Sequence, residues 1–292
     1  MRVTDSMRYN AALEARLHAD QRVYDTSRTA SSGLRVEKPS DDPAAYATSV
    51  RLDGRVSSLD ARSKDMGRAS GDLGIAESTL TAAGDVMMRA KDIATWMASD
   101  TVDATTRAQT ANEVDQLRQS LIGLANTRGG QGYLFAGTKT DTPPFDPTGA
   151  FVGNDSQQNV EIADGVIVAA NASGAQAFTA AAGGRDVLKD LQDFADALRA
   201  NDVVGIRSAI DTTETGRRQI VDVRSASGVT LERLQSATDV TSAAVTKLTE
   251  SKAAQVEADP VTAYSDLVNA QTSYERNLAV TKQLISMSSQ QG

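Results

Sequence analysis

Residues 66–90 read MGRASGDLGIAESTLTAAGDVMMRA, and this stretch carries the pattern that decides the fold. A large apolar residue recurs at every seventh position, and an alanine follows it three positions later. The repeat comprises Leu52, Leu59, Met66, Leu73, Leu80 and Met87, with Ala69, Ala76, Ala83 and Ala90 as its small members. Because such a repeat lines the face along which one helix packs against another, it predicts a heptad seam.

A second, weaker seam lies in residues 202–258. Its apolar members keep one register and come in three pairs, Val203 with Ile206, Leu231 with Leu234, and Val245 with Leu248. Polar residues such as Arg217, Arg224, Thr238 and Thr241 interrupt it. A helix of this length would run about 85 Å at about 1.5 Å per residue. Only a rod or a bundle of long helices accommodates it.

Two Asp-Pro steps mark helix starts. In Asp42–Pro43 and again in Asp259–Pro260, the aspartate can cap free amides while the proline takes the first helical position, where its missing N–H costs nothing. Upstream, apolar spacing predicts a helix to about residue 31, which Gly33 and Pro39 then end. We therefore expect one helix at each end of the chain, separated from the rod helices by these steps.

The composition changes in the middle of the chain. Ten of the 21 glycines lie in residues 129–184, and four of the five phenylalanines lie in residues 135–178. Residues 160–168, VEIADGVIV, predict a β-hairpin whose Asp-Gly turn supplies the positive φ angles. A further amphipathic helix follows, with Val187, Leu191, Phe194 and Leu198 on one face.

These elements predict a mainly α fold, a long antiparallel helical coiled-coil or rod bundle built from both chain ends, with a small β-rich inserted domain. We expect a terminal coiled-coil assembly domain in residues 1–40 and 259–292, a helical rod domain in 41–130 and 183–258, and an exposed insert in 131–182. Because the segments are nested, the two rods must lie side by side. The two chain ends should therefore meet at the same tip.

Composition excludes several function classes. The 292 residues hold 30 Lys and Arg against 38 Asp and Glu, and a net charge of −8 disfavours a nucleic-acid binder. The absence of Cys removes disulfides and thiol catalysis, and a single His makes a zinc site or a Ser-His-Asp triad improbable. We expect no catalytic, metal or cofactor site, and hence no enzyme.

The candidate chemical motifs have structural explanations. Residues 132–140 superficially resemble a phosphate loop, but Lys139 does not directly follow Gly137 and no strand-loop-helix context is predicted. Asp41 and Asp42 could form an acid-base pair, but capping accounts for Asp42 and leaves Asp41 solvated in the same turn.

Three other residues are expected to be structural. His18 lies on the first helix, where a lone histidine is usually a surface or packing residue. Trp96 and its neighbour Met97 should plug the end of the first rod.

No membrane segment is expected. Residues 1–6 lack the apolar core of a secretory signal, and the longest aliphatic run is Val166 to Ala170. The protein should be cytoplasmic or leave the cell by a route that does not read such a signal.

The two terminal helices carry apolar stripes that would be exposed to water if these thin helices stood alone. We expect these stripes to form an assembly interface with copies or partners. Their members are Val3, Met7, Leu13, Leu17, Tyr24, Tyr264, Leu267, Tyr274, Leu278 and Ile285.

Two longer motifs resemble those of the bacterial flagellin superfamily. Residues 31–44, SSGLRVEKPSDDPA, look like the signature after the first flagellin helix, and residues 124–145, LANTRGGQGYLFAGTKTDTPPF, look like a second signature at the entry to the insert. The prolines beside the acidic pair are more similar to the hook–filament junction family, hook-associated protein 3, than to flagellin. The signature residues are Ser32, Gly33, Leu34, Arg35, Asp41, Asp42 and Pro43, then Asn126, Thr127, Gly132, Tyr133, Phe135, Gly137 and Thr138.

The resemblance implies a structural protein of the bacterial flagellum, a junction that connects the hook to the flagellin filament. Its implied partners are hook-associated protein 1, flagellin, identical subunits in a ring, and an export chaperone before secretion; nucleic acid and membrane are not among them. It also implies export through the flagellar type III apparatus and an extracellular location. The alternatives are flagellin itself, an enzyme whose site lies in the insert, and a generic coiled-coil signalling or adhesion protein.

Overall fold

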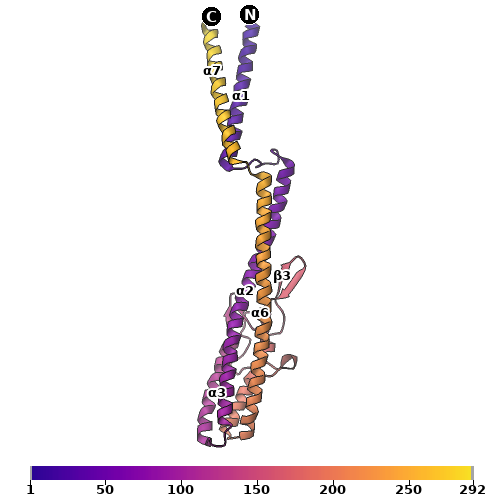
Figure 1. The fold of residues 1–292 in the computed structure, drawn as a ribbon, viewed down its shortest axis with the longest axis vertical. Helices are drawn as coiled ribbons and strands as arrows, with labels where there is room; N and C mark the ends of the chain where they lie inside the picture. Colours follow the sequence, from indigo (N-terminus) through magenta and orange to yellow (C-terminus); the bar gives the residue numbers. More distant parts are fainter. Residues whose placement is uncertain (1, 291–292) are drawn as a thin grey trace. The chain divides into compact units, whose positions relative to one another are not determined.

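The computed structural model describes residues 2–290, and helices dominate it (Figure 1). The mainly α fold and the small β region are thus confirmed. The elements are α1 (Arg2–Ser32), α2 (Pro43–Met97), α3 (Ala104–Ala125), β1 (Arg128–Gly129), β2 (Gly132–Tyr133), β3 (Asn159–Ala163), β4 (Val166–Ala169), α4 (Gly174–Phe178), the 3-10 helix η1 (Ala181–Gly183), α5 (Val187–Arg199), α6 (Val203–Val256) and α7 (Pro260–Gln290).

One compact unit comprises the residues up to Ser58 and those from Ala244 onward. In this unit α1 and α7 pack side by side in opposite directions, so the start of α1 lies beside the end of α7 (Figure 1). Small side chains, among them Ala19, Ala263 and Ala270, are buried between them. The predicted meeting of the two chain ends is confirmed.

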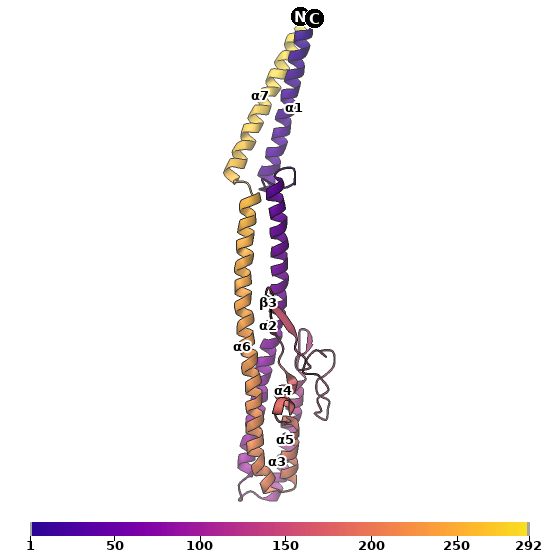
Figure 2. The ribbon, with the colours of Figure 1, turned by 90° about the vertical axis from the view of Figure 1, so that its right-hand side faces the viewer.

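The second unit, Leu59–Ala243, is a bundle in which α3 and α5 lie beside α2 and α6 (Figure 2). The α2 seam faces the interior, with Met66, Leu73, Leu80 and Met87 no more than 1% exposed. The alanines three positions on, from Ala69 to Ala90, are buried as well. Small residues let helices approach closely, so the predicted heptad seam is confirmed by its burial.

Polar cross-links fix the register of α2 against α6 within each unit. They are Lys91–Glu214 at 3.1 Å, Thr81–Arg224 at 3.3 Å and, in the terminal unit, Asp53–Lys252 at 2.7 Å. In every pair the two residue numbers have the same sum, which antiparallel helices without slippage require. The Arg217 guanidinium and the Lys91 ammonium hold the pKa of Glu214 far below its ordinary value.

The inner face of α6 alternates large and hydroxyl-bearing residues at heptad spacing. Ile206, Ile220 and Leu234 are fully buried, and Thr213 and Ser227 occupy the positions between them. Each hydroxyl donates to the carbonyl four residues earlier in its own helix, at 2.6 Å and 2.9 Å. These polar layers are therefore satisfied within α6, although they contribute less apolar contact than the layers of α2.

Trp96 and Met97 were both predicted to close the end of α2, and only Met97 does so. Met97 is fully buried, but Trp96 is 61% exposed. Successive residues of a helix point about 100° apart, and at this position Met97 faces the core while Trp96 faces solvent. The expectation for Trp96 was wrong.

A buried arginine joins the two turns beyond this end of α2. The Arg107 guanidinium donates from Nε to the Met97 carbonyl at 3.0 Å, from Nη2 to the Ser99 carbonyl at 2.8 Å and from Nη1 to Oδ1 of Asn201 at 2.6 Å. Asn201 has a φ of 53°, a left-handed conformation that asparagine tolerates better than most residues. Arg107 thus ties the α2–α3 turn to the α5–α6 turn.

Replacing Arg107 with alanine should lower the free energy of unfolding by about 2–4 kcal/mol, because it leaves buried carbonyls without donors. Urea denaturation followed by circular dichroism measures this. Arg207→Ala removes an exposed ion pair with Asp100 and should cost no more than about 1 kcal/mol. Equal losses of unfolding free energy in both variants would contradict the role of Arg107 in joining the two turns.

Several glycines of α2 occupy helical positions where a side chain would fit. A Cβ at Gly71 would meet no atom within 4 Å, and the residue is exposed in the middle of the helix. Gly71→Ala should therefore raise the free energy of unfolding by about 0.5–1 kcal/mol, since alanine restricts the unfolded chain. A loss of stability in the same urea assay would show that this position does need glycine.

The insert holds the predicted hairpin. β3 and β4 pair antiparallel, and Gly165 in the Asp-Gly turn has a φ of +75°. A second, very short pair, β1 with β2, joins Arg128 to Tyr133.

Candidate functional site: signature turns and an apolar terminal face

The first signature forms the turn between α1 and α2, and it is bonded to the turn between α6 and α7. The amides of Arg35 and Val36 donate to the Val256 carbonyl at 2.7 Å and 3.2 Å, and the Ala258 amide donates to the Gly33 carbonyl at 2.9 Å. Gly33 has a φ of +72°, which favours glycine. The signature therefore joins the two crossings between the terminal helices and the long helices.

The acidic pair of this signature organises the same turn. Oδ2 of Asp41 accepts bonds from the amides of Glu37 and Lys38, both at 3.1 Å, and forms an ion pair with Arg28 at 3.3 Å. Asp41 is exposed, as expected, and the turn in addition folds its own amides onto the carboxylate. Asp42 caps α2 as predicted, accepting from the Ala45 amide at 3.0 Å.

Backbone donors lower the pKa of both carboxyl groups. The Glu37 amide bond is the main cause that lowers the pKa of Asp41, and the Ala45 amide bond is the main cause for Asp42. Both side chains are partly exposed to solvent. We therefore expect the ionised carboxylates to stabilise this turn and to affect the rest of the fold little.

The turn should loosen in acid. Because the folded pKa of Asp41 lies below its ordinary value of 3.8, its stabilising contribution is complete above about pH 4 and is lost as the pH falls through the lowered pKa. Hydrogen-exchange protection of the Glu37 and Lys38 amides, measured by NMR, should fall over this range. Asp41→Asn should abolish most of that pH dependence. The same pH dependence in the native protein and in the Asp41→Asn variant would contradict the assignment.

The second signature anchors the insert to the end of α3. The Asn126 amide group forms two bonds with the backbone of Phe145, donating to its carbonyl at 2.9 Å and accepting from its amide at 3.0 Å. The Thr127 carbonyl accepts from the Leu134 amide at 3.1 Å. Phe135 is fully buried and packs edge-on against Phe178, with ring centroids 5.4 Å apart.

The glycines of this signature are required by close backbone contacts. Gly132 has a φ of +114°, and a Cβ there would collide with the Thr140 carbonyl. Gly137 has a φ of +67°, and a Cβ there would collide with Asn154. Oδ1 of Asn154 instead accepts from the Thr138 amide at 2.9 Å. These residues position loops, and none of them faces a substrate-sized cavity.

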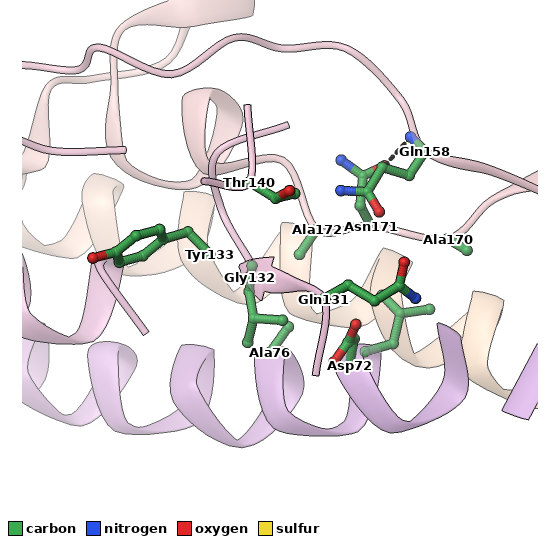
Figure 3. Close-up of a pocket in the computed structure, with 12 residues that line it drawn as sticks. Asp72, Ala76, Gln131, Gly132, Tyr133, Thr140, Gln158, Ala170, Asn171 and Ala172 are labelled. Atoms are coloured by element: carbon green, nitrogen blue, oxygen red, sulfur yellow. Dashed lines mark hydrogen bonds between the residues drawn. The ribbon is translucent and has the colours of Figure 1, made fainter. Parts of the chain in front are cut away.

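A small cavity lies where this loop meets α2 (Figure 3). Gly132 and Tyr133 come from the β2 segment, and Asp72 and Ala76 from α2 below it. Oδ1 of Asp72 accepts from the Gly130 amide at 2.7 Å. The cavity volume of about 20 Å³ is enough for roughly one water molecule.

Among residues 2–290 no cluster of three or more His, Cys, Asp or Glu side chains is arranged to hold a metal ion. No helix of the described chain is both long and apolar enough to cross a membrane.

The terminal helices expose large apolar side chains beside their buried seam. Most members of the predicted assembly stripe are exposed, namely Met7, Leu13, Leu17, Tyr24, Tyr264 and Ile285. Leu267, Tyr274 and Leu278 are half-buried, because part of each side chain packs within the α1–α7 pair. The side chain of Val3 lies outside the described ones.

The exposed residues of α1 form a line of their own. Leu13, Leu17 and Tyr24 follow one another at spacings of four and seven, which places them on one helix face. Ala19 and the half-buried Val23 lie on the face that meets α7. His18, next to Leu17, is a surface residue and lies off the apolar line.

Sequence comparisons point to flagellar proteins. Residues 3–140 match the family model described as the bacterial flagellin N-terminal helical region. The flagellar hook-associated protein 3 of Salmonella typhimurium is 26% identical over 180 residues, which are 61% of this chain and 57% of that protein. The Escherichia coli protein of the same name is 27% identical over 155 residues, 52% of this chain and 49% of that protein. The chain thus matches about half the length of these curated relatives.

Solved structures share the fold. A putative flagellar hook-associated protein from Vibrio parahaemolyticus aligns with a TM-score of 0.67 and 18% identity, covering 74% of this chain and 99% of that one. The Bacillus cereus FlgL structure aligns with a TM-score of 0.60 and 19% identity, covering 70% and 99%. The family-model match and the two curated relatives thus make the chain similar in sequence to flagellar hook-associated protein 3, and the solved structures show that it shares the fold of such proteins.

Proposed function

We propose that the protein is a structural, non-enzymatic component of the bacterial flagellum that joins the hook to the flagellin filament. The observation that carries this proposal is the pairing of α1 with α7, which brings both chain ends together and leaves a line of large apolar residues on the surface. Leu17 and Tyr24 are each about 60% exposed. Apolar lines of this kind on a two-helix pair are typical of surfaces that become buried on assembly.

The proposed partners follow from the family. Copies of the chain form a ring, hook-associated protein 1 binds on the hook side, and flagellin binds on the filament side. An export chaperone protects the C-terminal part before secretion, and the assembled protein is extracellular. In this proposal residues 1–40 and 259–292 are the assembly domain, 41–130 and 183–258 the rod domain, and 131–182 an outward-facing insert.

A charge on the apolar line should abolish assembly and leave the fold intact. Leu17→Glu places a carboxylate where a neighbouring subunit would bury an apolar side chain, which costs several kcal/mol. Cells carrying this variant should swim no better than cells lacking the protein, and electron microscopy should show hooks without filaments.

His18→Glu is the matched control, because it adds the same carboxylate one residue away and off the apolar line. It should leave motility and filament attachment unchanged, and both purified variants should keep the helix content of the native protein. Normal filaments on Leu17→Glu cells would contradict the proposal.

A further inference from the structure

The β3–β4 hairpin covers an apolar cluster that is separate from the main core of the bundle. The cluster contains Met66, Ala69 and Leu73 of α2 and Leu234 of α6, all at most 4% exposed. The hairpin contributes Val160, Ile162 and Val168, which are only partly buried on it. The hairpin is therefore held on the cluster largely by apolar side chains that are only partly buried.

The base of the hairpin is fixed to the rest of the insert. The Ala170 amide donates to the Gln158 carbonyl at 2.7 Å, and the Gln158 amide donates to Oδ1 of Asn171 at 2.8 Å. The Gln158 side chain donates in turn to the Gly137 carbonyl at 2.7 Å. These bonds fix the residues just before β3 and just after β4.

Arg62 of α2 binds the tip of the hairpin. Nη2 of Arg62 lies 2.6 Å from Oδ1 of Asp164 and 3.2 Å from Oε1 of Glu161. The same Glu161 oxygen accepts from the Gly165 amide at 3.1 Å, so the arginine, the strand and the turn form one network. Arg62 is 15% exposed while its two carboxylate partners are about half exposed, so salt can weaken these ion pairs.

A two-stranded hairpin has little stability of its own in water. This hairpin depends on a fixed base, shallow apolar contacts and an ionic contact at its tip. We propose that it is a strap, hinged at its base and latched by Arg62, which opens locally. Opening exposes the side of the α2–α6 seam that the hairpin covers, at Met66, Ala69, Leu73 and Leu234, while α2 and α6 stay paired. The Arg62 contacts thus determine whether the hairpin covers this apolar cluster.

Thiol labelling of the full chain tests the strap, because the native sequence has no cysteine. Ala69→Cys reports on the surface under the hairpin, and Ala111→Cys reports on the main core, where the alanine is fully buried. Adding Arg62→Ala should accelerate labelling of the Ala69→Cys protein by about tenfold. In the Ala69→Cys protein that retains Arg62, raising the salt concentration to about 0.5 M should also accelerate labelling.

Arg68→Ala is the matched control, because Arg68 also lies on α2 but pairs with Asp65 of the same helix. It should leave labelling of Ala69→Cys within about twofold. Labelling that is unchanged by Arg62→Ala would overturn the proposal. Equal acceleration at the Ala111→Cys position would also overturn it, because the bundle as a whole would then be opening.

Discussion

The close antiparallel packing of α2 against α6 is the constraint on which the other elements depend. Alanines alternate with leucine and methionine along the inner face of α2, so the helices approach closely without a wide core. Lys91–Glu214 and Thr81–Arg224 keep one register within the bundle unit. Because α6 runs back along α2, every segment between these two helices has to fold as an insertion.

The signature residues fix the loops that connect the long helices to the terminal helices and to the insert. Gly33 and the turn after it bond to the backbone that follows α6, and Asn126 bonds to the backbone of the insert. Their role is to hold loop backbones at fixed distances from long helices. This explains why the signatures are rich in glycine, asparagine and aspartate, the residues that satisfy or permit unusual backbone conformations.

Periodic and local signals made much of the fold predictable. The heptads placed α2 and α6, the Asp-Pro steps placed the starts of α2 and α7, and Asp164–Gly165 placed the hairpin turn. The separate helix α3 was not predicted, although its signal was present: Asp103 caps it, accepting from the Thr105 and Thr106 amides. Its apolar spacing is too short and too polar to stand out beside the long seams.

Features that depend on the folded turns and on helix packing were beyond sequence reasoning. Asp41 binds amides three and four residues earlier in the chain, which only the folded turn directs at its carboxylate. Arg107 binds Asn201, which belongs to a turn 94 residues later in the chain. The half-burial of Leu267 depends on where α1 crosses α7, which spacing within one helix does not define. Neither turn geometry nor helix packing follows from the spacing of residues within one element.

The junction role is tested most directly by negative-stain electron microscopy of the purified protein, alone in precipitating salt and then mixed with isolated hooks that carry hook-associated protein 1. The account predicts short caps on hook tips and no filaments from the protein alone. Long filaments formed by the protein alone would contradict it and identify a self-polymerising flagellin instead.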